Sequence, residues 1–276
     1  GAPKAARLPA AAIAAAVDAH VAALALGRED RWSLPLPLDH VGGIMATLRA
    51  LRCGCGVDLE PAPGAAATGA SLVPTMLARL VAARTAPPPR LRRALVGGGP
   101  LDPALAAAAR DLGWPVAETY GLTELGSMAT LDGVPVPGAQ VRVVDGRIEV
   151  GGAILFAGYE EDGGLRPAGP WHATGDRGEL VDGRLRVTGR EAELIVSGGE
   201  NVAAPEVEAA LLAHPLVAEA AVVGLPDREW GEVRVLIDGK ESGIRTRPPE
   251  RPVQPVLPRG PPVWRPWSPY PPAGHR

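Results

Sequence analysis

The stretch LRRALVGGGPLDPALAAAARDLGWPVAETYGLTE, residues 91–124, decides the fold of this chain. Residues 91–96 have the apolar character of a strand, and Pro103 then opens an alanine-rich helix that ends near Gly113. A second apolar strand follows at residues 115–119. A strand, a crossover helix and a strand predict two adjacent parallel strands of an α/β sheet, because such connections are right-handed in nearly all proteins.

Each of these two strands leads into a loop that contains glycine. The first loop is GGG at residues 97–99, and the second is YGLTE at residues 120–124. Both loops fall at the carboxyl edge of the predicted parallel sheet, where α/β folds place their ligands. We therefore expect the two loops to lie together and to form a ligand site.

The following segment predicts antiparallel hairpins. Residues 134–160 read as short strands and include VRVVDGRIEV, which has an Asp-Gly turn at its centre. A second hairpin, GELVDGRLRV at residues 178–187, has the same kind of turn. Its geometry returns the chain that enters at Asp176 and the chain that leaves at Arg190 to the same open end. A carboxylate and a guanidinium are therefore expected near each other.

Three parts of the chain are expected to differ in structure. The helix signal PEVEAALLAHP at residues 205–215 and the buried-strand signal VAEAAVVG that follows it are typical of a small α+β unit. We interpret residues 1–189 as part of a large domain, 190–238 as a truncated small domain, and 239–276 as a Pro/Arg-rich tail. The tail lacks an apolar period and is expected to be disordered or out of frame.

Charge and cysteine content exclude several classes of protein. Lys plus Arg total 28 against 31 Asp plus Glu, and the net charge of −3 predicts binding neither to nucleic acid nor to an anionic membrane. Cys53 and Cys55 are too few for a zinc site. Asp18 and His20 interrupt the Ala-rich run at residues 9–26, which predicts a helix but not a membrane span. We expect a cytoplasmic protein.

The motif ETYGLTE at residues 118–124 resembles the core motif of the adenylate-forming (AMP-binding) superfamily, which includes acyl-CoA ligases, luciferases and peptide-synthetase adenylation domains. Attack of a carboxylate on the α-phosphate of ATP needs an aromatic face for adenine, a hydroxyl at the phosphate and a carboxylate that holds Mg²⁺. The resemblance assigns these roles to Tyr120, Thr123 and Glu124, with Gly121 in the same nucleotide loop.

Other segments resemble nucleotide-binding motifs of the superfamily. Gly97, Gly98 and Gly99 match its glycine turn, whose main chain can approach the flat adenine ring closely. Asp176 in HATGDRG and Arg190 in VTGRE resemble the pair that contacts the ribose hydroxyls. A salt bridge at the mouth of the hairpin is the structural alternative for this pair.

The resemblance also covers the acid, the thiol and the phosphates. His40 in SLPLPLDHVGGI matches a residue beside the carboxylic substrate, and Ser197, Gly198 and Gly199 in SGGEN match the loop that lines the pantetheine path of coenzyme A. Lys4 in GAPK stands at the end of the phosphate loop. A structural histidine and a plain turn are the alternatives for the first two motifs.

Over residues 1–236 the chain resembles most of all the o-succinylbenzoate–CoA ligases of menaquinone biosynthesis. The resemblance implies an α/β fold and a reaction in two steps. ATP, with Mg²⁺, and the carboxylic acid first form an acyl-adenylate. Coenzyme A, the co-substrate, then takes the acyl group to form an acyl-CoA, and AMP is released. The hinge between the two domains of these ligases corresponds to Ala192 in this chain. One alternative is a ligase for another aryl or fatty acid. The other is a non-catalytic nucleotide-binding remnant, because the superfamily's C-terminal catalytic lysine has no match in this chain and Lys240 stands in a different context. The oligomeric state stays open, with a homo-oligomer possible.

Overall fold

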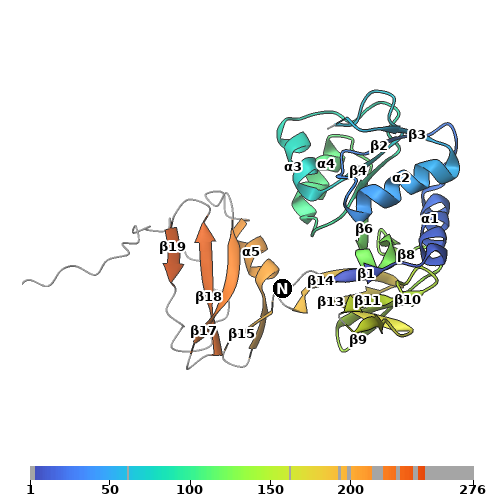
Figure 1. Cartoon of the computed structure of the whole chain (residues 1–276). Helices are drawn as coiled ribbons and strands as arrows, with labels where there is room; N and C mark the ends of the chain where they lie inside the picture. Colours follow the sequence, from blue (N-terminus) through green and yellow to red (C-terminus); the bar gives the residue numbers. More distant parts are fainter. Residues whose placement is uncertain are drawn as a thin grey trace, which may run out of the picture. The chain divides into compact units, whose positions relative to one another are not determined.

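The chain divides into two units in a computed structural model, Gly1–Thr188 and Gly189–Arg276 (Figure 1). The structure describes residues 4–60, 62–161, 163–191, 194–197, 200–212, 220–227, 231–238 and 242–245. None of the helices in these ranges combines the length and the apolar character needed to cross a bilayer.

A sheet of mostly parallel strands organises the first unit (Figure 1). Its order is β3 (Gly56–Asp58), β2 (Arg31–Ser33), β4 (Gly69–Leu72), β5 (Arg93–Val96), β6 (Val116–Leu122), β7 (Ser127–Leu131) and β8 (Val134–Pro135). The strands from β3 to β6 are parallel, whereas β7 and β8 add to the β6 edge in antiparallel fashion. Strand β6 is therefore the element at which the sheet changes from parallel to antiparallel pairing.

The expected strand, crossover helix and strand are confirmed. Strand β5 and strand β6 are parallel neighbours, and α4 (Pro103–Asp111) connects them. Asp102 caps this helix, because its Oδ1 accepts a hydrogen bond of 2.8 Å from the backbone N–H of Ala104. The chain thus has the α/β fold that residues 91–124 predict.

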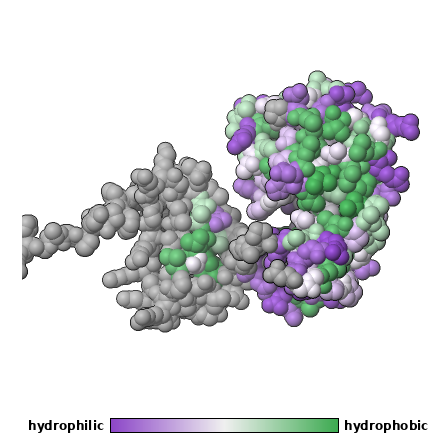
Figure 2. Space-filling view, in the orientation of Figure 1, coloured by the Kyte–Doolittle hydropathy of each residue, from purple (hydrophilic) through white to green (hydrophobic). Residues whose placement is uncertain are grey.

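Helices cover both faces of the parallel part of the sheet. On one face, α1 (Ala10–Leu24) and α2 (Val41–Cys53) pack with Trp32 and Leu95 in one apolar core. On the other face, α3 (Pro74–Ala82) and α4 share a second core with Val96 and Trp114. Neighbouring residues 95 and 96 belong to opposite cores, as expected for a strand covered on both faces. Apolar side chains are also exposed around α2 (Figure 2), where Leu51 is 73% exposed.

Two smaller sheets complete the first unit. The order of one is β14 (Arg184–Arg190), β13 (Trp171–Val181), β10 (Arg147–Gly152) and β9 (Ala139–Val144), and it contains both expected hairpins. The other has β11 (Gly158–Glu161) between β1 (Ala5–Arg7) and β12 (Gly164–Pro167). In this sheet Ala5 pairs with Glu160 and Ala6 with Tyr159, so the start of the described chain lies beside a strand far along the sequence.

The second unit is α+β. Its helix is α5 (Ala204–Leu212), and its strands are β15 (Leu194–Ser197), β16 (Glu200–Ala203), β17 (Ala221–Asp227), β18 (Gly231–Asp238) and β19 (Ser242–Arg245). The structure differs from the expected disordered tail at Ser242–Arg245, since β19 pairs with β18. An open strand edge offers unpaired N–H and C=O groups, so a short segment can pair there without an apolar pattern of its own. Lys240, Ala192 and residues 246–276 lie outside the described residues.

His20 is a fully buried imidazole between α1 and the antiparallel strands. Its Nε2–H donates to the backbone carbonyl of Met128 at 2.8 Å, and its Nδ1 has no partner among the described residues. Burial, with a smaller contribution from the charge of Arg49, lowers the pKa of His20 to about 4. The imidazole is therefore neutral in the folded protein at neutral pH.

Acid should weaken the folded state through His20. The unfolded chain binds a proton at this histidine near pH 6.5, whereas the folded chain does so only near pH 4. The free energy of unfolding is therefore expected to decrease as the pH falls from 6.5 to 4, by up to about 3 kcal/mol from this residue. Urea unfolding at several pH values should show a weaker dependence for His20→Gln, which cannot titrate. The exposed His40 gives the matched control, and equal slopes for His20→Gln and His40→Gln would contradict the assignment.

Candidate active site

The loop after β6 is shaped by a close approach of two backbone segments. The pairing of β6 with β7 shifts register between Tyr120 and Gly121, and a Cβ on Gly121 would lie 1.4 Å from the carbonyl oxygen of Ser127. Only glycine can occupy this position without movement of the backbone. Ser127 itself has a φ of +87°, which is a strained conformation for a residue with a side chain. The 3₁₀ turn η1 (Thr123–Leu125) lies between these two residues.

The glycine loop after β5 lies against the same strand. A Cβ on Gly97 would be 2.2 Å from the Oγ1 atom of Thr119, and this hydroxyl donates to the carbonyl oxygen of Val96 at 3.3 Å. Gly98 has a φ of +79°, in the left-handed region that favours glycine. The structure therefore brings the two predicted loops together at the carboxyl edge of the sheet.

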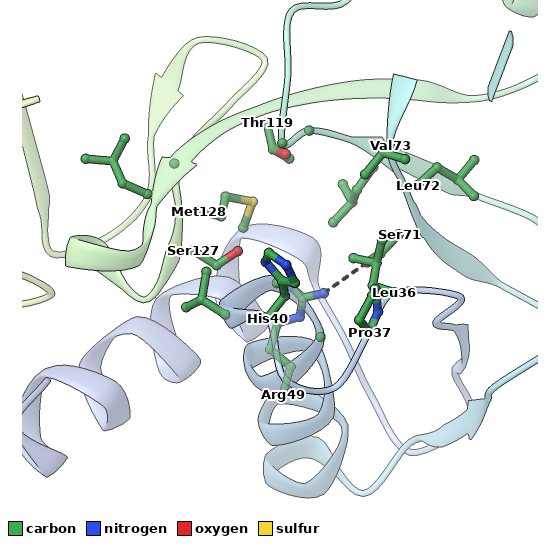
Figure 3. A pocket seen from close by; sticks show the side chains of 18 residues that line it. Leu36, Pro37, His40, Arg49, Ser71, Leu72, Val73, Thr119, Ser127 and Met128 are labelled. Atoms are coloured by element: carbon green, nitrogen blue, oxygen red, sulfur yellow. Dashed lines mark hydrogen bonds between the residues drawn. The ribbon is translucent and has the colours of Figure 1, made fainter. Parts of the chain in front are cut away.

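A cavity of about 330 Å³ opens between these loops and α2 (Figure 3). Figure 3 shows His40, Ser127 and Met128 on one side of the cavity and Leu72 and Val73 on the other. The full lining consists of Leu36, Pro37, His40, Val41, Gly42, Gly43, Arg49, Ser71, Leu72, Val73, Leu95, Gly97, Gly98, Thr119, Gly121, Leu122, Ser127 and Met128. This lining is mainly apolar, includes no acidic residue and is suited to an organic acid. His40, the N-cap residue of α2, lines this cavity, and its place beside a carboxylic substrate stays a prediction.

The sequence reasoning missed Arg49, which is the one cation in this lining. Only 4% of Arg49 is exposed, its Nη2 donates to the Oγ atom of Ser71 at 3.4 Å, and its guanidinium carbon lies 5.3 Å from the ring centroid of Trp32. Its Nε–H has no partner among the described residues. Burial lowers the pKa of Arg49 to about 10, so the side chain stays charged at neutral pH. A buried guanidinium with an unused donor suits a carboxylate.

Glu124 is contacted by β11 and by the segment that leads into this strand. The hydroxyl of Tyr159 donates to its Oε1 at 2.5 Å, and the backbone N–H of Phe156 donates to its carbonyl oxygen at 2.8 Å. The Nζ of Lys4 lies 5.4 Å from the centroid of the Tyr159 ring. The structure thus brings Lys4 to the neighbourhood of the YGLTE loop, although the two are far apart in the sequence.

The predicted nucleotide residues Tyr120 and Asp176 are in direct contact. The hydroxyl of Tyr120 donates to the Oδ2 of Asp176 at 2.8 Å, and Asp176 is only 5% exposed. Arg190 is the last residue of β14, a strand that pairs with β13, and Asp176 lies in β13. Ser197 ends β15 in the second unit, whereas Gly198 and Gly199 lie outside the described residues.

Comparison with known proteins decides the family. A model of the AMP-binding enzyme family matches residues 1–160, and a model of the AMP-binding enzyme C-terminal domain matches residues 206–237. The chain belongs to the AMP-binding enzyme family. A curated 2-succinylbenzoate–CoA ligase from Salmonella typhimurium is 38% identical over 253 residues, which are 86% of this chain and 55% of that protein.

Two solved structures of AMP-binding enzymes from Bacillus subtilis share this fold. The o-succinylbenzoate CoA synthetase in complex with the acyl-adenylate intermediate OSB-AMP has a TM-score of 0.75 and 30% identity, over 85% of this chain and 56% of that one. The same synthetase in complex with ATP and a magnesium ion has a TM-score of 0.74 and 30% identity, over 85% and 56% of the two chains. The chain spans about half the length of the relatives that it matches.

Proposed function

We propose that this chain forms the acyl- and nucleotide-binding part of an AMP-forming 2-succinylbenzoate–CoA ligase. In the first step a carboxylate oxygen of the acid attacks the α-phosphorus of ATP, and pyrophosphate leaves with the electrons of the broken P–O bond. In the second step the thiol of coenzyme A attacks the acyl carbon, and AMP leaves. The activity rests on the family, and the choice of acid rests on the cavity.

The buried charge of Arg49 at the cavity carries the proposal of a dicarboxylic acid. One carboxylate of 2-succinylbenzoate is activated, and the second remains charged throughout the reaction. A charged carboxylate inside a mainly apolar cavity of about 330 Å³ requires a cation, which Arg49 supplies. A fatty acid or benzoate has no second charge and would leave Arg49 without an anionic partner in the cavity. His40, at the same cavity, is proposed to lie beside the acid.

Adenosine is proposed to bind at the pair of loops. Tyr120, with Gly121 and the 97–99 loop, would contact the adenine, and Asp176 with Arg190 would bind the ribose hydroxyls. The hydrogen bond of 2.8 Å between Tyr120 and Asp176 supports this assignment, since it joins the two groups that would face one nucleoside. Thr123 would donate its hydroxyl to the phosphate, and Lys4 would lie toward the outer phosphates. Ser197, Gly198 and Gly199 would serve the thiol of coenzyme A.

The residues present fit a magnesium ion that is shared with the nucleotide. The described residues contain no cluster of three or more His, Cys, Asp or Glu that could hold a metal by themselves. Mg²⁺ is usually bound by one or two carboxylates together with substrate phosphates, and Glu124 supplies such a carboxylate beside the nucleotide loop. When bound, the ion would neutralise the charge that develops on the phosphates.

Calorimetric titration tests the proposed function. The protein is expected to bind AMP, and to bind a non-hydrolysable sulfamoyl adenylate of 2-succinylbenzoate at least about tenfold more tightly than the benzoyl and hexanoyl analogues, because only the first carries a second carboxylate. Equal affinities for the three analogues would favour a ligase for another acid. Binding without release of pyrophosphate from ATP would favour a nucleotide-binding remnant, and a failure to bind AMP would contradict the site itself.

A further inference from the structure

A buried phenol holds the carboxylate that is proposed to meet magnesium. Tyr159 lies in β11 and is 9% exposed, and its hydroxyl donates to the Oε1 of Glu124 at 2.5 Å. The second carboxylate oxygen, Oε2, accepts no hydrogen bond from a described residue. One oxygen of Glu124 is therefore fixed, and the other is available to a ligand.

The ring of Tyr159 is itself fixed from several sides. It packs edge-to-face on Phe156, with 4.9 Å between the ring centroids, and it lies 6.1 Å from the ring of His172. The guanidinium of Arg166 and the ammonium of Lys4 lie 5.1 Å and 5.4 Å from its centroid. Such contacts need the aromatic ring but not its hydroxyl. A phenylalanine would keep all of them.

The main chain and the side chain of Glu124 are held by the same segment. Phe156 donates its backbone N–H to the carbonyl oxygen of Glu124 at 2.8 Å, and Tyr159 donates to the carboxylate. A glutamate side chain loses considerable rotamer freedom when it binds a cation. The bond to the backbone holds the residue in place, and the bond to Oε1 removes part of the side-chain freedom before the cation arrives, which favours binding.

We propose that Tyr159 is a positioning residue for Glu124 and that its hydroxyl sets the magnesium dependence of nucleotide binding. The inference rests on the proposed function, because it assumes that Glu124 meets a nucleotide-bound cation. The hydrogen bond to Oε1 orients the carboxylate and leaves Oε2 for the cation. Groups that orient a metal ligand in this way typically change metal affinity about 10- to 100-fold when they are removed.

Tyr159→Phe tests the inference. The apparent Kd for Mn²⁺ is expected to rise about tenfold or more in the full chain. It is measured in the presence of a non-hydrolysable ATP analogue, from the electron paramagnetic resonance signal of free Mn²⁺. The Kd for AMP in the absence of metal is expected to change by less than about twofold, since the ring contacts are kept. The same titration with Mg²⁺ by calorimetry should show the same shift.

Tyr120→Phe provides the matched variant, because it removes a hydroxyl of the same kind that bonds to Asp176 instead. It is expected to weaken AMP binding, whereas the Mn²⁺ constant measured at a saturating concentration of the ATP analogue is expected to stay unchanged. An unaltered Mn²⁺ constant in Tyr159→Phe would overturn the inference, as would an equal loss of AMP and Mn²⁺ binding, which a merely structural role predicts. If the unmodified protein binds AMP but no nucleotide-linked Mn²⁺, the inference falls while the adenosine site stands. If it binds neither, the proposed function falls as well.

Discussion

Arg49→Leu is expected to lower the affinity for the 2-succinylbenzoyl sulfamoyl adenylate by about two orders of magnitude. Arg49 is 4% exposed and lines the cavity, so a carboxylate that enters the cavity gains a charged partner that no other lining residue replaces. Leucine fills much of the same volume but leaves that carboxylate without a partner in an apolar wall. Calorimetric titration of both proteins with this analogue and with AMP measures the effect.

The stability of the same variant separates a binding role from a structural one. Replacement of a buried charge by an apolar side chain is often neutral or stabilising, because the cost of burying the charge disappears. We therefore expect Arg49→Leu to have an unchanged or higher Tm while its affinity for the analogue falls. Arg49→Lys is the control that keeps the charge but not the several N–H donors of the guanidinium. Its affinity for the analogue should lie between those of the unmodified protein and Arg49→Leu. Unchanged affinity for the dicarboxylic analogue would refute the assignment.

Gly121→Ala is expected to disrupt the nucleotide loop. A Cβ at this position would lie 1.4 Å from the carbonyl oxygen of Ser127, and backbone atoms cannot yield as the end of a flexible side chain does. We expect a loss of about 3 kcal/mol or more in the free energy of unfolding. AMP affinity should fall at least about tenfold, because the same movement displaces Tyr120. Chemical unfolding and AMP titration report the two effects.

Gly64→Ala is the matched control for this change. No atom lies within 4 Å of a Cβ at Gly64, so the same addition of a methyl group meets open space there. Its stability and its AMP affinity should remain close to those of the unmodified protein. If Gly121→Ala had the same stability and AMP affinity as Gly64→Ala, the close approach of the two backbone segments would not determine the conformation of the loop.

Local signals in the sequence predicted part of the first unit, namely α1, β5, α4, β6 and the antiparallel hairpins. Pro103 begins α4 as expected, and the two Asp-Gly turns close hairpins with positive φ at both residues, 51° and 75° at Asp145 and Gly146. The same dipeptide at Asp132 and Gly133 joins β7 to β8 with φ values of 49° and 76°. These features depend only on residues that are adjacent in the chain, which is why sequence alone could indicate them.

The missed residues depend on long-range packing. Arg49 lies on the buried face of α2 with Met45 and Ala46, and an arginine on an apolar helical face was the available signal. Tyr159 meets Glu124 only because β11 is placed beside η1, which no local pattern reveals. The contact of Tyr120 with Asp176 likewise joins two separate sheets. The motif YGLTE indicated which chemistry to expect, but the residues that contact its carboxylate could be identified only from the folded structure.

The pairing of β1 with β11 has a consequence for how the protein is made. During synthesis Ala5 and Ala6 leave the ribosome long before their partners Glu160 and Tyr159 exist, whereas β5, α4 and β6 can assemble as soon as one short segment has emerged. Closing the long loop carries an entropic cost that only late contacts repay. The nascent chain should therefore acquire its glycine loop early and bring Lys4 to Tyr159 among its last steps, so that the proposed phosphate side of the site forms after the proposed adenine side.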